Sequence, residues 1–181
     1  MPVEMKSKVC LIGDPGVGKT SLVSRFVLNA FSEKYLSTVG TVVSKKTILI
    51  KYPKTGMVDH TFLIWDIVGQ QRLQKLHRMY YRGAKGAILV CDVTRKETLE
   101  HLPHWLELLA SVEENLPTIL LVNKTDMMDE WAISTEDIDE FKNKLNFTSY
   151  MTSAKTGKNV EEAFLHLGKI IYENEEECNE R

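Results

Sequence analysis

The apolar positions of this chain fall into short continuous runs that alternate with longer, helix-like runs. Three continuous apolar runs have the length of a strand: residues 8–12, 86–92 and 117–123. Such runs are typical of parallel strands that helices cover on both faces. Helices are predicted after these strands, ending near residue 29, over residues 96–114 and 134–145, and from about residue 159 onward. Ser134 and Asp137 have the spacing of a capping box. Strands that alternate with helices predict an α/β fold.

One stretch departs from this alternation and predicts a β-hairpin. Residues 41–51 and 60–66 are rich in Val, Ile, Thr and Phe, and they flank a turn that contains Pro53 and Gly56. The hairpin adds an antiparallel strand at one edge of a mostly parallel sheet. No linker or internal repeat divides the 181 residues, so we expect one domain over residues 1–181. Its core is expected at about residues 7–173, with a short acidic end at 174–181.

Composition excludes several classes of protein. The chain has 23 Lys and Arg against 25 Asp and Glu, a net charge of −2, which argues against a nucleic-acid partner. No apolar run approaches the ~18 residues of a membrane span, and the start does not resemble a signal peptide. The three cysteines are far apart, and Cys10 and Cys91 lie in apolar runs. We therefore expect buried free thiols and a reducing, cytoplasmic compartment.

The strongest chemical motif follows the first predicted strand. Residues 13–20 (GDPGVGKT) fit G-x-x-x-x-G-K-[ST], placed between a strand and a helix. In this arrangement backbone N–H groups at a helix N-terminus face an anion. The Lys19 ammonium adds a positive charge for the terminal phosphates, and the Thr20 hydroxyl can bind Mg²⁺. The motif predicts a site for the phosphates of a nucleotide.

Three further polar segments follow predicted strands in order. They are residues 66–70 (DIVGQ), 123–126 (NKTD) and 153–155 (SAK). An acid at the end of a strand can hold Mg²⁺ through water, and a glycine N–H can meet a γ-phosphate. Each segment alone is typical of an ordinary polar loop. The four motifs together, each after a strand, favour one nucleotide site.

These motifs carry a resemblance that extends over about residues 7–173. The chain resembles a small GTPase of the Ras superfamily, and within it most resembles the Rab branch. Further segments with the Rab pattern are Tyr80-Tyr81-Arg82-Gly83-Ala84, Cys91-Asp92-Val93-Thr94 and Val160-Glu161-Glu162-Ala163-Phe164. The resemblance implies the three-layer P-loop NTPase G domain. Its sheet has six strands, mostly parallel with one antiparallel edge strand, and helices on both faces. GTP is the implied substrate, GDP the product and Mg²⁺ the cofactor.

The resemblance also implies a role for each residue of the site. The implied phosphate-binding residues are Asp14, Pro15, Gly16, Val17, Gly18, Lys19, Thr20 and Ser21. The implied catalytic residues are Gln70, which would orient the attacking water, Lys19 and Gly69. The implied metal ligands are Thr20, Thr38 and Asp66. Around the base and the sugar-phosphate, the implied nucleotide-binding residues are Phe31, Tyr35, Asn123, Lys124, Asp126, Ser153, Ala154 and Lys155.

The implied function is a slow GTP-hydrolysing switch. Its loops near residues 31–41 and 66–82 would be ordered by GTP and then bind effector proteins. A nucleotide-exchange factor and a GTPase-activating protein are the other implied partners, and a monomer is expected. Pro15 and Val68 depart from the residues usual in the family, and Val43 stands where Rab proteins commonly carry an effector-binding Phe.

These departures keep a second function open, a GTP-stabilised interaction scaffold with negligible hydrolysis. A P-loop kinase is disfavoured, because residues 123–126 and 153–155 have no role in one.

The last residues bear on membrane association. Residues 173–181 carry five Glu and one Arg, and Cys178-Asn179-Glu180-Arg181 lacks the aliphatic pattern of a prenylation signal. We therefore expect no stable membrane anchor in this sequence, and peripheral membrane association only through a partner or a missing tail. A lineage without lipid anchors, such as an archaeal relative, fits this expectation.

Overall fold

A six-stranded sheet forms the centre of the protein. The computed structural model describes residues 3–33, 40–67 and 74–179. The strands lie in the order β2-β3-β1-β4-β5-β6. Among them β2 and β3 pair antiparallel, and all other neighbours pair parallel. The strands are β1 (Val3–Ile12), β2 (Thr41–Tyr52), β3 (Gly56–Ile67), β4 (Gly86–Asp92), β5 (Thr118–Asn123) and β6 (Thr148–Met151). The predicted sheet, with its antiparallel edge strand, is confirmed.

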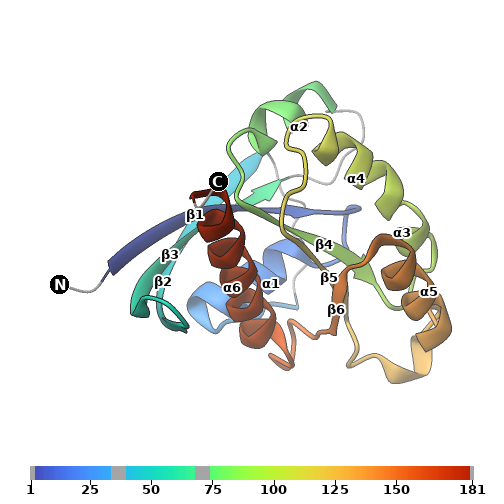
Figure 1. Cartoon of the computed structure of the whole chain (residues 1–181). Coiled ribbons are helices and arrows are strands. Elements are labelled where there is room, and N and C mark those ends of the chain that lie inside the picture. The colour runs from blue at the N-terminus through green and yellow to red at the C-terminus, as the bar shows by residue number, and fades with distance from the viewer. Residues whose placement is uncertain (1–2, 34–39, 68–73, 180–181) are drawn as a thin grey trace.

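Helices cover both faces of this sheet (Figure 1). They are α1 (Lys19–Leu28), α2 (Gln74–Tyr81), α3 (Glu97–Glu100), α4 (Leu102–Ala110), α5 (Thr135–Leu145) and α6 (Val160–Asn179), with a short 3₁₀ turn, η2, at Met128–Glu130. Side chains of a strand alternate between faces, so Val9 and Leu11 pack with α1 and α6. Cys10 and Ile12 pack on the opposite face with residues of α2 to α5. The central strands β4 and β5 are therefore buried on both sides, which explains their continuous apolar runs.

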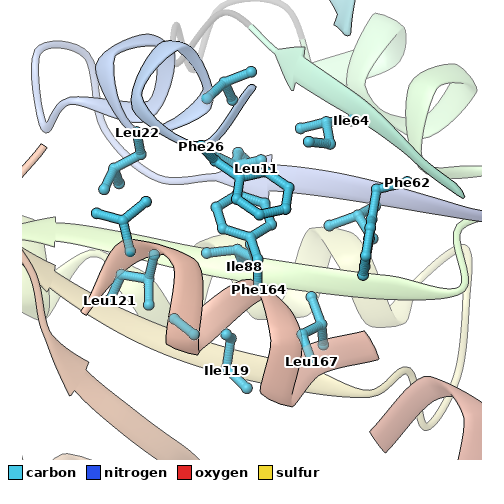
Figure 2. Packing of buried hydrophobic residues seen from close by; sticks show 14 of the residues in the cluster. Leu11, Leu22, Phe26, Phe62, Ile64, Ile88, Ile119, Leu121, Phe164 and Leu167 are labelled. Atoms are coloured by element: carbon cyan, nitrogen blue, oxygen red, sulfur yellow. The ribbon is translucent and has the colours of Figure 1, made fainter. Parts of the chain in front are cut away.

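Aromatic rings hold α1 and α6 together over the sheet (Figure 2). Phe26 of α1 stacks on Phe164 of α6 with ring centroids 3.9 Å apart, and Phe62 of β3 lies nearly perpendicular to Phe26 with ring centroids 6.0 Å apart. Gly168 allows α6 to approach, because a Cβ there would lie 2.7 Å from Cζ of Phe62. Each such ring pair adds about 0.5–1.5 kcal/mol beyond the burial of its area.

Several local predictions are confirmed. The Ser134 hydroxyl accepts from the Asp137 N–H at 3.1 Å, and the Asp137 carboxylate accepts from the Ser134 N–H at 3.0 Å, so the capping box is present. Lys96 and Ser134 donate to Asp137 and lower its pKa to about 2. Cys10 and Cys91 are buried free thiols, and burial raises the pKa of Cys10 to about 12. Within the described segments, no helix has the length and apolar character needed to cross a bilayer.

The elements of the structure differ from the predicted ones in four places. The single helix predicted over 96–114 is two helices, because Pro103 at the start of α4 has no N–H to continue the bonding of α3. The segment 174–179, predicted as a separate acidic end, continues α6. Residues 74–81, inside the predicted switch segment 66–82, form helix α2. The strand β1 also begins at Val3, since residues 3–8 pair with β3 along one edge.

A buried polar network joins the hairpin to α6. His60 is fully buried; its Nδ1 lies 2.5 Å from the Tyr52 hydroxyl and its Nε2 lies 2.8 Å from the Ser7 hydroxyl. The Tyr52 hydroxyl also donates to the Gly168 carbonyl at 3.4 Å. Burial lowers the pKa of His60 to about 4. The folded state therefore contains a neutral imidazole.

This neutral histidine makes stability depend on pH. Between pH 6.5 and 4 the unfolded chain binds a proton at His60 that the folded chain excludes, so stability falls as the pH falls through this window. We expect the free energy of unfolding to drop by about 2 kcal/mol from pH 7 to pH 4.5. Urea denaturation at a series of pH values measures this. His60→Gln, whose amide keeps both donor and acceptor, should flatten the profile; an unchanged slope would contradict the assignment.

Candidate nucleotide-binding site

The loop of residues 13–18, between β1 and α1, requires glycine at two points. Gly18 has φ +100°, and a Cβ there would lie 2.3 Å from Nδ2 of Asn123. Gly13 would bring a Cβ to 2.3 Å from the Val90 carbonyl oxygen. Gly16, between them, also has positive φ, at +74°. The glycines thus allow the loop to turn tightly against β4 and β5.

Lys19 places a buried positive charge inside this loop. Its side chain is 7% exposed, and Nζ donates to the Gly13 carbonyl at 2.7 Å and the Asp14 carbonyl at 2.9 Å. Burial lowers the pKa of Lys19 to about 8, while Asp66 and Asp14 oppose that shift. The residue also begins α1, whose first turn has no acidic residue. Helix dipole and ammonium together favour an anion here.

Thr20 and Asp66 form a pair of oxygen ligands beside Lys19. The Thr20 hydroxyl donates to Oδ2 of Asp66 at 2.5 Å. Asp66 is 2% exposed, and its Oδ1 has no hydrogen-bond partner among the described residues. Burial raises the pKa of Asp66, opposed by Thr20 and Lys19. An unpartnered buried carboxylate oxygen is costly, and hydroxyl and carboxylate oxygens suit Mg²⁺. This donor set therefore fits the implied ion.

Within the described residues, no cluster of three or more His, Cys, Asp or Glu side chains could bind a metal by itself. Mg²⁺ is commonly held by one or two protein ligands together with water and substrate phosphates. The pair formed by Thr20 and Asp66 is consistent with that kind of site.

Asn123 connects the phosphate loop to the other loops. Its side chain is buried, and Nδ2 donates to the Val17 carbonyl at 2.9 Å. Its Oδ1 accepts from the Ala154 N–H at 3.2 Å and from the Thr152 hydroxyl at 3.4 Å. The sequence predicts that Asn123 reads the base. In the structure its amide binds two other segments, the phosphate loop and residues 152–154, so it positions them relative to each other.

Asp126 and Ser153 are brought together at the edge of the site. The Ser153 hydroxyl donates to Oδ1 of Asp126 at 2.6 Å, and it accepts from the Thr156 N–H at 3.1 Å. Ser153 is buried, whereas Asp126 is exposed. The carboxylate is therefore oriented by a fixed hydroxyl and remains accessible to a ligand.

The two lysines predicted to contact the base make ion pairs with the protein. Lys124, in a left-handed conformation with φ +66°, places Nζ 2.6 Å from Oδ2 of Asp92. Lys155 lies 3.1 Å from Glu33, and both side chains are more than half exposed. The ion pair between Lys155 and Glu33 therefore contributes little to stability. Phe31 is 36% exposed just after α1.

One supporting residue has no motif in the sequence. Arg25 of α1 donates from Nε to the Ala154 carbonyl at 2.8 Å and from a terminal nitrogen to the Lys155 carbonyl at 2.6 Å. These bonds hold the loop at residues 153–155 against α1. The separation of about 130 residues along the chain leaves no local signal that could predict them.

Four predicted site residues lie outside the described residues: Tyr35, Thr38, Gly69 and Gln70. Val68, one of the departures from the family pattern, also lies there. The roles assigned to these residues stay predictions.

The close approach at Gly18 predicts a large effect of one methyl group. Gly18→Ala should lower the free energy of unfolding by about 3 kcal/mol and weaken nucleotide binding. The added methyl group would both strain the left-handed backbone and clash with the Asn123 side chain. Gly56→Ala is the matched control: φ there is +76° and a Cβ would meet nothing within 4 Å. It should cost only about 1 kcal/mol, from backbone strain alone. Chemical denaturation and GDP titration compare the two variants; equal effects would contradict this account.

Sequence comparison identifies the family. Residues 8–173 match the sequence model of the Ras family. Ras-related protein Rab11D of Nicotiana tabacum is 41% identical over 166 residues, which cover 91% of this chain and 72% of that protein. Ras-related protein RABA4b of Arabidopsis thaliana is 41% identical over 171 residues, covering 94% and 74%. Ras-related protein Rab-22A of Homo sapiens is 36% identical over 165 residues, covering 91% and 82%.

The matched region contains all four motifs of the site, from the phosphate loop to residues 153–155. This similarity favours hydrolysis over a scaffold that only binds GTP. Members of the family act with effectors, exchange factors and GTPase-activating proteins. The chain belongs to the Ras family, as a Rab-like small GTPase that binds GTP, hydrolyses it and serves as a molecular switch.

Proposed function

We propose that residues 13–21 hold the phosphates of GTP, and that Mg²⁺ is held by Thr20, Thr38 and Asp66. The observation that carries this proposal is the Thr20–Asp66 pair, with an unpartnered carboxylate oxygen, beside the buried Lys19 ammonium. When bound, the ion would neutralise charge on the phosphates. Lys19, now bonded to two loop carbonyls, would exchange these bonds for phosphate oxygens.

The base is selected at Asp126. Guanine presents an N1–H and an N2 amino group side by side, and a carboxylate offers two acceptor oxygens that match them. Adenine presents a lone pair at N1, which would face the carboxylate. The Ser153 hydroxyl fixes the orientation of this carboxylate. Asn123 and Arg25 hold the loop at residues 153–155 in place, and the Ala154 and Lys155 segment closes the base site.

Hydrolysis depends on residues of the second switch segment. Gln70 orients the attacking water and the Gly69 N–H meets the γ-phosphate, while Lys19 takes up charge that develops on the transferred group. In this family a partner protein often supplies an arginine that raises the rate by about 10³–10⁵. We propose that the monomer hydrolyses GTP slowly by itself, and that the loops near 31–41 and 66–82 present an effector surface in the GTP form.

Pro15 departs from the residue usual at this position in the family, and this departure bears on hydrolysis. Proline has no N–H, so the loop loses one potential donor to the phosphates. Its ring is exposed at the surface of the loop, where a partner arginine would approach. Both effects reduce the rate that a GTPase-activating protein can reach.

Replacing the Asp126 carboxylate with an amide should change which nucleotide the protein prefers. Asp126→Asn replaces an acceptor with a donor, so the affinity for GDP should fall and that for xanthosine diphosphate should rise. The loss for GDP is expected to be roughly 10²-fold or more. Asp129→Asn, an exposed aspartate three residues further on, is the control and should change neither affinity. Equal binding of ADP and GDP by the wild type would contradict guanine selection.

Removal of the water-orienting amide should slow hydrolysis without weakening binding. Gln70→Leu is expected to lower the single-turnover rate of GTP by at least about tenfold at unchanged GDP affinity. Gln71→Leu, the adjacent glutamine, is the control. A rate indifferent to Gln70→Leu would show that another group orients the water. Fast hydrolysis by the protein alone, near the ~10 s⁻¹ of a median enzyme, would contradict the need for a partner.

A further inference from the structure

Side chains from residues 92–105 bind two consecutive residues of the phosphate loop, Asp14 and Pro15. Oδ2 of Asp14 lies 2.6 Å from Nδ1 of His101, and its Oδ1 accepts from the indole N–H of Trp105 at 2.8 Å. A terminal nitrogen of Arg95 donates to the Pro15 carbonyl at 3.0 Å. The Asp14 and Pro15 positions are therefore held by side chains from outside the loop.

Arg95 also reaches toward the base-binding loop. Its Nε donates to Oδ2 of Asp92 at 3.1 Å, and the same oxygen lies 2.6 Å from Nζ of Lys124. The other carboxylate oxygen accepts from the N–H and hydroxyl of Thr94 at 3.0 and 2.7 Å. Burial acts to raise the pKa of Asp92, yet the donors on Lys124 and Thr94 outweigh it and the pKa is lowered. A buried carboxylate, 1% exposed, thus joins two cations from different loops.

The bond to the Pro15 carbonyl has a specific consequence. The peptide unit between Pro15 and Gly16 is planar, so fixing its carbonyl oxygen also fixes the direction of the Gly16 N–H. Gly16 has φ +74° and no Cβ, and glycine readily permits this peptide to rotate. In the proposed site the Gly16 N–H points to phosphate. Arg95 therefore holds a phosphate-binding N–H in its productive direction.

We propose that Arg95 is a positioning residue that couples the phosphate loop to Lys124 of the base-binding loop through Asp92. This inference rests on the proposed nucleotide site and adds a determinant of how long the nucleotide stays bound. Through one guanidinium, orientation of the Gly16 N–H and placement of Lys124 depend on each other. The two ends of the nucleotide are then released together.

The geometry requires arginine at this position. Two donors on separate nitrogens reach Asp92 and Pro15 at the same time. A lysine ammonium is a single point charge on a flexible stem and cannot span both acceptors with fixed geometry. Arg95→Lys should therefore keep the charge and lose the coupling.

The test is the dissociation rate of GDP, followed with a fluorescent GDP analogue. Arg95→Ala should release it about tenfold faster than wild type, the effect of one lost charge-assisted hydrogen bond. Arg95→Lys should also release it faster. Lys96→Ala is the matched control: it removes the same charge from the next residue, whose ammonium pairs with Asp137 at 2.8 Å. It should leave the rate within twofold of wild type.

Two further measurements separate coupling from a merely structural role. Arg95→Ala and Lys124→Ala should be non-additive in a double-mutant cycle on GDP dissociation. Hydrogen exchange at the Gly16 N–H should speed up in Arg95→Ala, while the melting temperature and exchange in β5 stay close to wild type. Additive effects in the cycle, or a rate for Arg95→Ala no faster than for Lys96→Ala, would overturn the inference.

The proposed site has its own readout. Lys19→Ala should abolish GDP binding in an otherwise folded protein. Failure of the wild type to bind GDP, or full binding by Lys19→Ala, would overturn the proposed site itself. GDP binding that depends on Lys19 while Arg95→Ala matches the Lys96→Ala control would overturn only the role of Arg95.

Discussion

The buried amide of Asn123 is the interaction on which the rest of the site depends. It donates to the Val17 carbonyl and accepts from the Ala154 N–H, so one side chain joins the phosphate loop to the loop after β6. A buried polar group must find its hydrogen-bond partners inside the protein, because each buried group left without a hydrogen bond costs about 1–3 kcal/mol of stability. The contact is possible because Gly18 presents no Cβ to the amide. Phosphate and base ends of the site are therefore parts of one framework.

Several charged side chains around this framework are buried, and their surroundings differ. Lys19 and Asp66 are both nearly inaccessible, and each has its pKa shifted toward the neutral form by burial. Asp92 shows the opposite balance, since Lys124 and Thr94 donate to it and keep its pKa low. The Asp92 carboxylate has donors on both oxygens, as a supporting residue would, whereas Oδ1 of Asp66 has no partner among the described residues, as the proposed ligand site requires.

Most of the fold could be predicted from the sequence, because continuous apolar runs indicate the buried parallel strands. It did not predict the break between α3 and α4, since one proline inside an amphipathic stretch was outweighed by the apolar pattern around it. The predicted site motifs lie together where they fall in the described residues. Arg25, Arg95 and Asp92 were not assigned to the site, because their contacts join segments far apart in the chain. The role of Asn123 as a bridge likewise depends on packing that no local pattern encodes.

We infer that these loops form a single site for a guanine nucleotide. The most direct measurement is extraction and identification of the nucleotide that stays bound to the purified protein, with its stoichiometry. Close to one equivalent of GDP or GTP per chain is expected, and treatment with a chelator should remove it. An adenine nucleotide in that position, or a folded protein that retains no nucleotide and binds none when GDP and Mg²⁺ are added, would contradict it.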